Sequence, residues 1–158
     1  LHLVPKPGGS GEKKWRVCLD YRRLNLVSES QGWPIPRIDS VLQRIGAHRP
    51  KYFAILDLTS GYHQAPMAEE SQECTAFITP IGTYEWLRVP MGPKGAPSYF
   101  QQQMAHTVLK DLIHKILEVY MDDIIIFANS IEELCERLQA VLQKFHEFGL
   151  TVNPEKCK

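Results

Sequence analysis

Three aspartates stand out because each ends or interrupts a strongly apolar stretch. Asp57 ends an apolar run that begins at Tyr52, and Asp122 and Asp123 together separate two further apolar runs. An aspartate at a strand end is commonly a turn former, but an unpaired charge is costly between segments this apolar. If the strands are neighbours, two carboxylates at roughly 4 Å repel each other by about 4 kcal/mol at an effective dielectric constant of about 20. We therefore expect a cation between them.

The chemistry that such an arrangement suggests is phosphoryl transfer. Two divalent ions about 3.5–4 Å apart serve in-line displacement at phosphorus, one activating the attacking oxygen and one holding the leaving group. Ligands that are all oxygen favour Mg²⁺ or Mn²⁺. Because successive strand residues face opposite ways, Asp122 and Asp123 cannot both point at one ion unless the turn twists them. We predict that Asp57 and Asp122 bridge the two ions, with Asp123 in support.

The elements that would hold these acids follow from the hydrophobic pattern. Continuous or alternating apolar runs predict strands, and apolar residues at helical spacing predict amphipathic helices. The first predicted strand is 52–58, whose continuous apolar run suits burial on both faces. Two hairpins are predicted, one pairing 75–79 with 83–89 and one pairing 116–121 with 124–128. A further strand starts at 150, and two short strands flank a Gly-rich tip at 5–11. The predicted helices are 38–46, about four turns along 96–108, and 131–148 after a capping box at Ser130 and Glu133. This order predicts an α+β fold, an antiparallel sheet with helices on one face.

Composition and charge narrow the class of protein. Hydrophobic residues make up 44% of the 158 residues and charged residues 23%, which is typical of one globular domain and argues against a disordered chain. Apolar runs of only a few residues are too short to span a membrane. Residues 1–50 hold nine basic and four acidic side chains and the remainder nine and fourteen, so a basic end adjoins an acidic body. That asymmetry fits a polyanion on one part and cations on the other, or simply two solvated surfaces of unequal charge.

The four cysteines lie far apart in the sequence, at 18, 74, 135 and 157, and form no Cys-x-x-Cys pair. This spacing excludes a zinc knuckle and a redox motif, so we expect reduced thiols in the core. The chain starts at Leu1 without an initiator Met or an apolar leader. We expect a piece of a longer intracellular polypeptide, in the cytoplasm or a virus-like particle and not secreted.

Several motifs in a consistent order resemble one family. Tyr120-Met121-Asp122-Asp123 between apolar runs, preceded by the segment 56–64 around Asp57, is similar to the reverse transcriptases of long-terminal-repeat retrotransposons and retroviruses, and most of all to gypsy-type elements. The same resemblance covers essentially the whole chain, through the segments 15–25, 33–38 and 152–157. It implies a right-hand polymerase: residues 1–50 mostly fingers, residues 51–158 mostly palm with interleaved fingers segments, and no thumb, connection or ribonuclease H region.

The resemblance also implies residue roles. Asp57, Asp122 and Asp123 match the catalytic triad, and the backbone carbonyl at Leu58 matches a further metal ligand. Tyr62 matches the steric gate, an aromatic ring that would clash with a ribose 2′-hydroxyl; its alternative is core packing.

Other positions match contacts to the nucleotide and to nucleic acid. Lys6 and Arg16 match fingers residues that clamp the incoming triphosphate, where fixed cations stabilise charge on the phosphates. Met91 matches a nucleotide contact, although segment 90–97 departs from the usual gypsy-type sequence. The template and primer positions are Lys94 and Gly95, which resemble the retroviral version, and Tyr120 and Met121. A base such as Lys94 also suits a template phosphate or plain solvent exposure near a helix start.

The activity implied is RNA- and DNA-templated DNA synthesis, in which two Mg²⁺ or Mn²⁺ ions serve the transfer of deoxynucleotides to a primer 3′-hydroxyl. The implied partners are an RNA or DNA template, a DNA or RNA primer, deoxynucleoside triphosphates and the rest of a polyprotein, with no membrane. Two alternatives stay open. An RNA-directed RNA polymerase shares the palm, but Tyr120-Met121 before the acids disfavours it. A non-catalytic, nucleic-acid-binding remnant of a retroelement would keep the fold without the chemistry.

Overall fold

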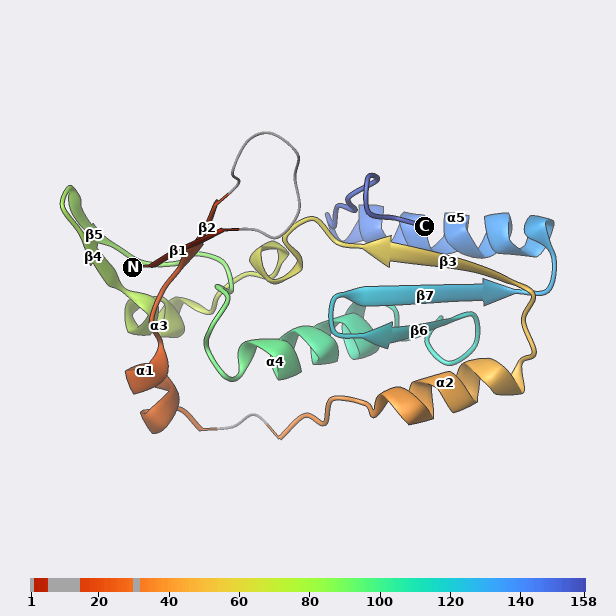
Figure 1. Ribbon diagram of the computed structural model, residues 1–158, viewed down its shortest axis with the longest axis horizontal. Helices are drawn as coiled ribbons and strands as arrows, with labels where there is room; N and C mark the ends of the chain where they lie inside the picture. The colour runs from red at the N-terminus through yellow and green to blue at the C-terminus, as the bar shows by residue number, and fades with distance from the viewer. Residues whose placement is uncertain (1, 6–14, 30–31) are drawn as a thin grey trace.

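The computed structural model describes residues 2–5, 15–29 and 32–158. In Figure 1 the elements fall into two groups, with α4 running between them. The strands are β1 (His2–Pro5), β2 (Trp15–Cys18), β3 (Tyr52–Asp57), β4 (Phe77–Thr79), β5 (Gly82–Tyr84), β6 (Leu117–Tyr120) and β7 (Asp123–Ala128). The helices are α1 (Arg22–Val27), α2 (Ile38–Ala47), α3 (Glu69–Gln72), α4 (Ala96–Gln103) and α5 (Ile131–Glu147), with 3₁₀ turns η1 (Gly61–Gln64) and η2 (Glu73–Thr75) and a π-helical turn η3 (Met104–Val108).

The main sheet has three antiparallel strands in the order β3-β7-β6, with β7 in the centre. The register places Asp57 opposite Asp123 across β3 and β7, and Tyr120 opposite Asp123 across β6 and β7. The hairpin predicted around the paired aspartates is therefore confirmed. Its turn is only two residues long, Met121 and Asp122, and Asp123 already belongs to β7.

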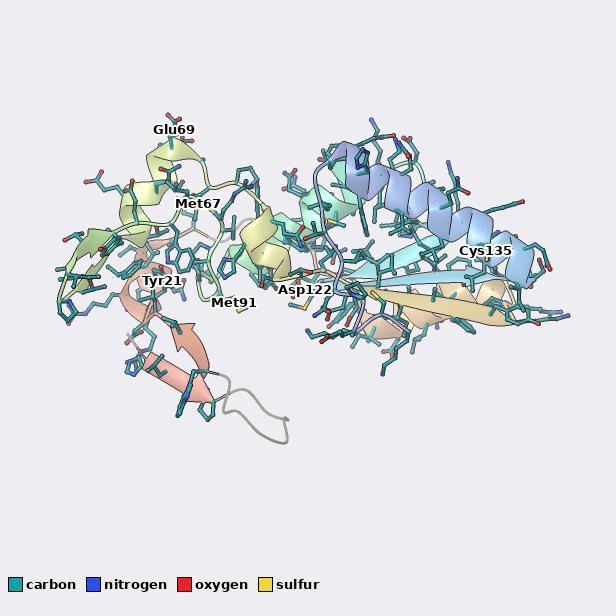
Figure 2. The ribbon with its side chains drawn as sticks, turned by 90° about the horizontal axis from the view of Figure 1, so that it is seen from above. Tyr21, Met67, Glu69, Met91, Asp122 and Cys135 are labelled. Carbon is teal, nitrogen blue, oxygen red and sulfur yellow. The ribbon has the colours of Figure 1, made fainter. Side chains whose placement is uncertain are left out.

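Helices cover both faces of this sheet. Ile124 and Ile126 of β7 pack in the main core with residues of α4 and α5, such as Phe100 and Phe145. Phe127 points the other way and packs against α2 in a second, smaller cluster. Figures 1 and 2 show α2 and α5 on opposite sides of the sheet. The expectation of helices on one face holds for α4 and α5 and is wrong for α2, because β7 is apolar at successive positions and both of its faces need cover.

The edge strand β3 is less buried than its apolar sequence predicts. Its first residues, Tyr52 and Phe53, are 40% and 51% exposed, so the predicted burial on both faces is wrong for this half of the strand. The second half is covered by the end of the chain. Backbone hydrogen bonds join Ile55 to Lys158 in both directions, at 2.8 and 3.0 Å, and the Asn153 N–H donates to the Asp57 carbonyl at 2.8 Å.

The strand predicted from residue 150 is wrong in extent. Val152 forms a single antiparallel bridge with Leu58, and no strand is assigned there in the described part of the chain. Pro154 follows closely, and proline cannot donate a ladder hydrogen bond, so pairing continues only through irregular backbone contacts.

The other predicted elements are confirmed within a few residues, except that the strand predicted over 83–89 ends at Tyr84. The β1–β2 and β4–β5 pairs form antiparallel hairpins, and the Gly-rich tip between β1 and β2 lies outside the described residues. The predicted capping box is present: the Ser130 hydroxyl accepts from the Glu133 N–H at 3.1 Å, while the Glu133 carboxylate accepts from the Asn129 N–H at 2.6 Å.

No helix in the described ranges is long and apolar enough to cross a bilayer. All four cysteines are free. Cys74 and Cys135 are exposed, so the expectation of core thiols is wrong for these two, and Cys18 and Cys157 are only half-buried.

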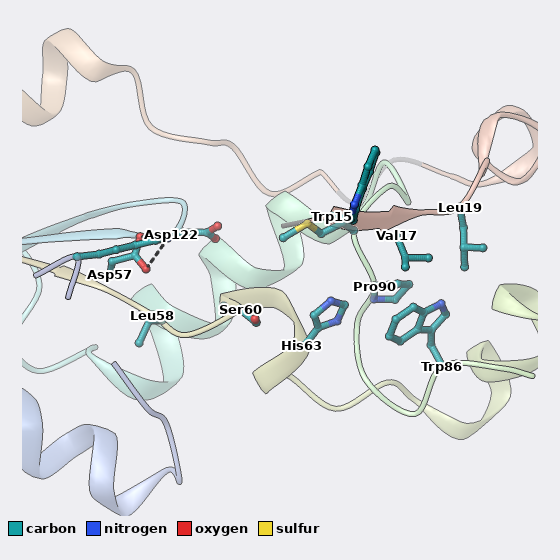
Figure 3. A pocket seen from close by; sticks show the side chains of 13 residues that line it. Trp15, Val17, Leu19, Asp57, Leu58, Ser60, His63, Trp86, Pro90 and Asp122 are labelled. Carbon is teal, nitrogen blue, oxygen red and sulfur yellow. Dashed lines mark hydrogen bonds and ion pairs between the residues drawn. The ribbon is translucent and has the colours of Figure 1, made fainter. Parts of the chain in front are cut away.

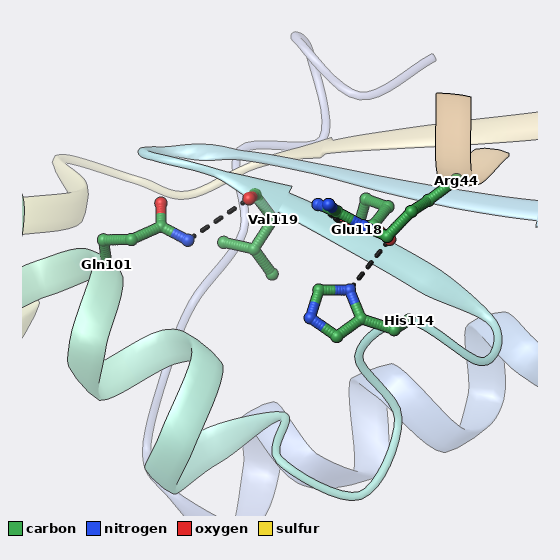
Figure 4. A network of polar contacts seen from close by, with 5 residues as sticks. All are labelled: Arg44, Gln101, His114, Glu118 and Val119. Carbon is green, nitrogen blue, oxygen red and sulfur yellow. Dashed lines mark hydrogen bonds and ion pairs between the residues drawn. The ribbon is translucent and has the colours of Figure 1, made fainter. Parts of the chain in front are cut away.

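A buried carboxylate ties α2 to the sheet. Glu118 of β6 is 1% exposed and receives two hydrogen bonds from Arg44 of α2, at 2.8 and 2.9 Å. His114 also contacts Glu118, at 2.9 Å (Figure 4). Burial raises the pKa of the Glu118 carboxyl, but the hydrogen bonds from Arg44 and His114 outweigh burial and leave that pKa below its ordinary value. This ion pair anchors the smaller cluster on the α2 face.

Candidate active site

A pocket of about 400 Å³, called the large pocket below, lies where the two groups of elements meet. Figure 3 shows Asp57 and Asp122 at one end and Trp15, Val17 and Trp86 toward the other. The pocket is lined by Trp15, Val17, Leu19, Asp57, Leu58, Ser60, Gly61, His63, Trp86, Pro90, Met91, Asp122 and Lys156. The sheet thus contributes the acids, and the β2 segment contributes an apolar and aromatic wall.

The three predicted acids gather at one end of the sheet but face two cavities. Asp57 lines the large pocket with Asp122, and it also lines a smaller cavity of about 260 Å³ with Asp123. Antiparallel pairing explains why Asp57 and Asp123 share a face, since directly opposed residues point to the same side of a sheet. The turn carries Asp122 to the large pocket, which it lines together with Asp57, and leaves Asp123 lining the smaller cavity.

The Asp122 carboxylate lies partly buried among other negative charges. Its Oδ1 atom is buried and has no hydrogen-bond partner among the described residues. Burial raises the pKa of the Asp122 carboxyl, and the nearby negative charges of Asp123 and Asp57 raise it further, while Lys156 opposes them. The site is therefore short of positive charge when its acids are ionised.

One side-chain cation, Lys156, reaches the site, although no sequence motif predicts a role for it. The Lys156 Nζ atom donates to both carboxylate oxygens of Asp57, at 3.1 and 3.2 Å. The pairing of the chain end with β3 carries Lys156 there, because Asn153 bonds to the Asp57 backbone three residues earlier. The Lys156 side chain is 62% exposed, so it can swing into solvent. The sequence features that point to Lys156 are its basic side chain late in the chain and the surplus of acidic residues after residue 50.

The donor set suits a hard divalent cation, although it is not a preformed cage. No group of three or more His, Cys, Asp or Glu side chains in the part of the chain described here has the geometry of a metal site. The orphaned Asp122 oxygen and the clustered carboxylates nevertheless match the oxygen ligands that Mg²⁺ and Mn²⁺ prefer. Asp57 and Asp122 would hold such an ion, and the Lys156 ammonium would then move away from Asp57.

Gly61 lies between Asp122 and an aromatic pair. A Cβ atom at Gly61 would lie 3.4 Å from the Asp122 Oδ1 atom and 3.4 Å from the Phe100 ring, so it would touch both. Tyr62 is only 9% exposed and meets Phe100 edge-on, with ring centroids 5.3 Å apart. Burial and the charge of Asp122 raise the pKa of the Tyr62 hydroxyl to about 12. Tyr62 is thus largely buried, while its neighbours in sequence, Gly61 and His63, line the large pocket.

His63 and Trp86 are pocket residues to which the sequence analysis gave no role. Their rings stack with centroids 5.0 Å apart and an interplanar angle of 9°. The His63 Nδ1 and Trp86 Nε1 atoms are buried without partners among the described residues. His63 and Trp86 are 23 residues apart in the sequence, and no local sequence pattern predicts their contact. Their place in the pocket is evident only from the structure.

The positions predicted to contact nucleotide and template divide between two cavities. Met91 lines the large pocket, whereas Lys94 and Gly95 line a separate cavity of about 330 Å³. Asn25 fixes the loop between them, because its side chain accepts from the Lys94 N–H at 2.8 Å and donates to the Gly92 carbonyl at 3.0 Å.

The remaining predicted positions lie as follows. Leu58 is buried at 3% and also borders the large pocket. Tyr120 closes the hairpin opposite Asp123, and Met121 occupies its turn. The backbone of Arg16 lies in β2 opposite Val4, and its side chain lies outside the description. Lys6 lies outside the described residues.

Comparison with known proteins agrees with this geometry. The family model described as reverse transcriptase (RNA-dependent DNA polymerase) matches residues 4–158. The chain is 42% identical over 157 residues to the retrovirus-related Pol polyprotein from transposon 297 and 43% identical over 157 residues to that from transposon opus, both of Drosophila melanogaster. Each alignment covers 99% of this chain but only 14% and 15% of those polyproteins.

A solved structure has the same fold. The foamy viral protease-reverse transcriptase in complex with an RNA/DNA hybrid superposes with a TM-score of 0.84 at 29% sequence identity, over 98% of this chain and 20% of that one. Enzymes of this kind generally use divalent metals, in agreement with the oxygen-rich pocket. The family model, the transposon relatives and the shared fold together place the chain in the reverse transcriptase family.

Proposed function

We propose that this chain is the nucleotide-adding part of an RNA-directed DNA polymerase, with Asp57 and Asp122 as its principal metal ligands. The observation that carries the proposal is the orphaned, buried Asp122 oxygen in a pocket that it shares with Asp57. In this reading residues 1–50 are mostly fingers and residues 51–158 mostly palm. The foamy viral relative was solved with an RNA/DNA hybrid, which supports a template and primer as partners.

The reaction would be attack of a primer 3′-oxygen on the α-phosphorus of a deoxynucleoside triphosphate. The new P–O bond forms as the bond to the β-phosphate breaks, pyrophosphate leaves, and the 3′-hydroxyl proton is lost. Two Mg²⁺ or Mn²⁺ ions would activate the attacking oxygen and hold the leaving group. Asp57 and Asp122 would bind these ions and Asp123 would support them. Trp15, Val17 and Met91 would enclose the nucleotide from the far side of the pocket.

The positions outside the large pocket have proposed roles as well. The Leu58 carbonyl would complete the metal ligands, and Lys6 and Arg16 would hold the triphosphate. Lys94 and Gly95, in their separate cavity, would meet the template strand, and Tyr120 and Met121 would meet the primer end.

The test is primer extension by a longer polypeptide in which this chain is followed by the thumb of a related reverse transcriptase. On an RNA template with a DNA primer, we expect Mg²⁺-dependent addition of deoxynucleotides that stops when the metal is chelated. Addition of ribonucleotides at the same efficiency would favour an RNA polymerase instead. Nucleic-acid binding without extension, in Mg²⁺ or Mn²⁺, would identify an inert remnant and contradict the proposal.

Tyr62 is the proposed sugar gate of this active site. We expect Tyr62→Ala to lower discrimination against ribonucleotides about 10- to 100-fold, because removal of the ring opens space for a 2′-hydroxyl. Tyr62→Phe keeps the ring and should keep the discrimination. The measurement is the ratio of kcat/KM for a deoxynucleotide and its ribonucleotide, which does not depend on the folded fraction of a core variant. Equal ratios in Tyr62→Ala and the parent would refute the gate.

A further inference from the structure

Gln101 of α4 is a buried polar side chain with two backbone partners. Its side-chain amide donates from Nε2 to the Val119 carbonyl at 3.2 Å, and its Oε1 accepts from the Met121 N–H at 2.7 Å. The residue is 2% exposed, and Figure 4 shows its side chain reaching the strand at Val119. Both hydrogen-bonding ends of one amide therefore hold the backbone just before Asp122.

The turn that Gln101 contacts is strained. Met121 has a φ of 54°, a left-handed conformation that non-glycine residues rarely adopt. In a two-residue hairpin whose first central residue alone has positive φ, glycine is the usual choice. A methionine persists in such a place only where the surroundings hold it. The Met121 N–H lies at this strained residue, and Gln101 is the side chain that binds it.

The same helix also supports the opposite wall of the acid cluster. Phe100, the neighbour of Gln101, packs against Tyr62 and lies 3.4 Å from the Cβ position of Gly61, which in turn faces Asp122. Through these two adjacent residues α4 spans the distance between η1 and the β6–β7 turn. Among the described residues, no hydrogen bond joins the Gln101 side chain to Asp57, Asp122 or Asp123.

We infer that Gln101 is a positioning residue, which sets the direction of the Asp122 carboxylate by holding the strained turn from behind. The inference rests on the proposed function, since it concerns the same metal-binding acids. Its chemical requirement is a neutral amide: the oxygen accepts from Met121, the nitrogen donates to Val119, and no charge is added beside Asp122. A misplacement of about 1 Å at a reacting group costs on the order of 100-fold in rate.

The test compares Gln101→Leu with Gln102→Leu, a matched substitution at the next position of α4. In the longer polypeptide we expect Gln101→Leu to lower kcat about 30- to 100-fold, with KM for the deoxynucleotide within about 3-fold of the parent. In the 158-residue chain we expect the Kd for Mn²⁺, measured by titration calorimetry, to rise about 10-fold. Gln102→Leu should match the parent in both measurements.

A third variant keeps the test decisive if Gln101→Leu does not fold. Gln101→Met is unbranched and close to glutamine in length and volume, but it lacks both hydrogen-bonding groups, so it should fold more readily than Gln101→Leu and lose kcat and Mn²⁺ affinity to a similar extent. Unchanged kcat and Mn²⁺ affinity per folded molecule in both Gln101 variants would overturn the inference while leaving the proposed function intact. A parent that neither extends primers nor binds Mn²⁺ would instead overturn the proposed function, and the inference with it.

Discussion

Asp122→Asn is expected to lower nucleotide addition at least about 1,000-fold and, at the same time, to stabilise the metal-free chain. Activity falls because the variant loses one of the two carboxylates proposed to hold the metal, at the position where charge develops in the transition state. Stability rises because the ionised Asp122 is partly buried beside Asp57 and Asp123. We expect a gain of about 1 kcal/mol, or about 3 °C in Tm for a domain of this size.

The pH dependence of this gain has a definite sign. In the folded chain burial and two neighbouring acids raise the pKa of Asp122 above its ordinary value of 3.8. A group whose pKa is raised in the folded chain stabilises the fold at any pH below its ordinary pKa. This stabilisation is lost as the pH rises through the folded-state pKa. The difference in Tm between Asp122→Asn and the parent should therefore be present near pH 7 and shrink toward pH 3.

The measurements are primer extension by the longer polypeptide and thermal unfolding of the 158-residue chain, with and without Mn²⁺. The control is Asp111→Asn, which removes an exposed acid from a turn away from the pocket. Mn²⁺ should raise the Tm of the parent and of the control, but raise that of Asp122→Asn much less. Full primer extension by Asp122→Asn would exclude Asp122 as a metal ligand.

The location of the acids was accessible from sequence because a charge at the end of an apolar run is costly and needs compensation. This cost singles out Asp57, Asp122 and Asp123, and antiparallel pairing of β3 with β7 brings them to one end of the sheet. The same pattern predicted the hairpin and the long helix α5. Hydrophobic periodicity and turn residues can be read from sequence because they lie within, or a few residues from, the element that they specify.

The features that escaped prediction depend on contacts between distant segments. Lys156 reaches Asp57 across 99 residues of sequence because the chain end pairs with the β3 edge. Gln101 is one of three consecutive glutamines, and only its burial against the turn separates it from the other two. The position of α2 on the second face follows from which side Phe127 points. Neither composition nor periodicity contains that information.

Arg44→Met is expected to destabilise the chain by about 3 kcal/mol near pH 7. Glu118 is 1% exposed, and removal of Arg44 leaves its buried charge with His114 as the remaining partner. Breaking a buried ion pair from one side typically costs 3–5 kcal/mol. We take the lower end because the Arg44 side chain is 36% exposed, and solvent screens part of its interaction. At this size the loss corresponds to roughly 10 °C in Tm.

Arg44→Met should change Tm in the opposite direction to Asp122→Asn, and its effect should also shrink in acid. The hydrogen bonds from Arg44 and His114 lower the folded-state pKa of Glu118 despite its burial. The stability that this provides is present above the ordinary pKa of 4.5 and is lost as pH falls through the folded-state value. The difference in Tm between parent and variant should therefore be largest near neutral pH and narrow in acid, where protonated Glu118 no longer needs the guanidinium.

A double-mutant comparison separates the buried charge from simple loss of packing. In Arg44→Met with Glu118→Gln the buried charge is gone, so the pair should recover about half or more of the stability lost in Arg44→Met alone. Lys144→Met provides the matched control, because it breaks an exposed pair with Glu147 on α5 and should change Tm by no more than about 2 °C. Unfolding followed by circular dichroism measures all four proteins. If the second substitution recovered nothing, Arg44 would stabilise the α2 face by packing of its side chain, and the buried carboxylate would carry no uncompensated charge.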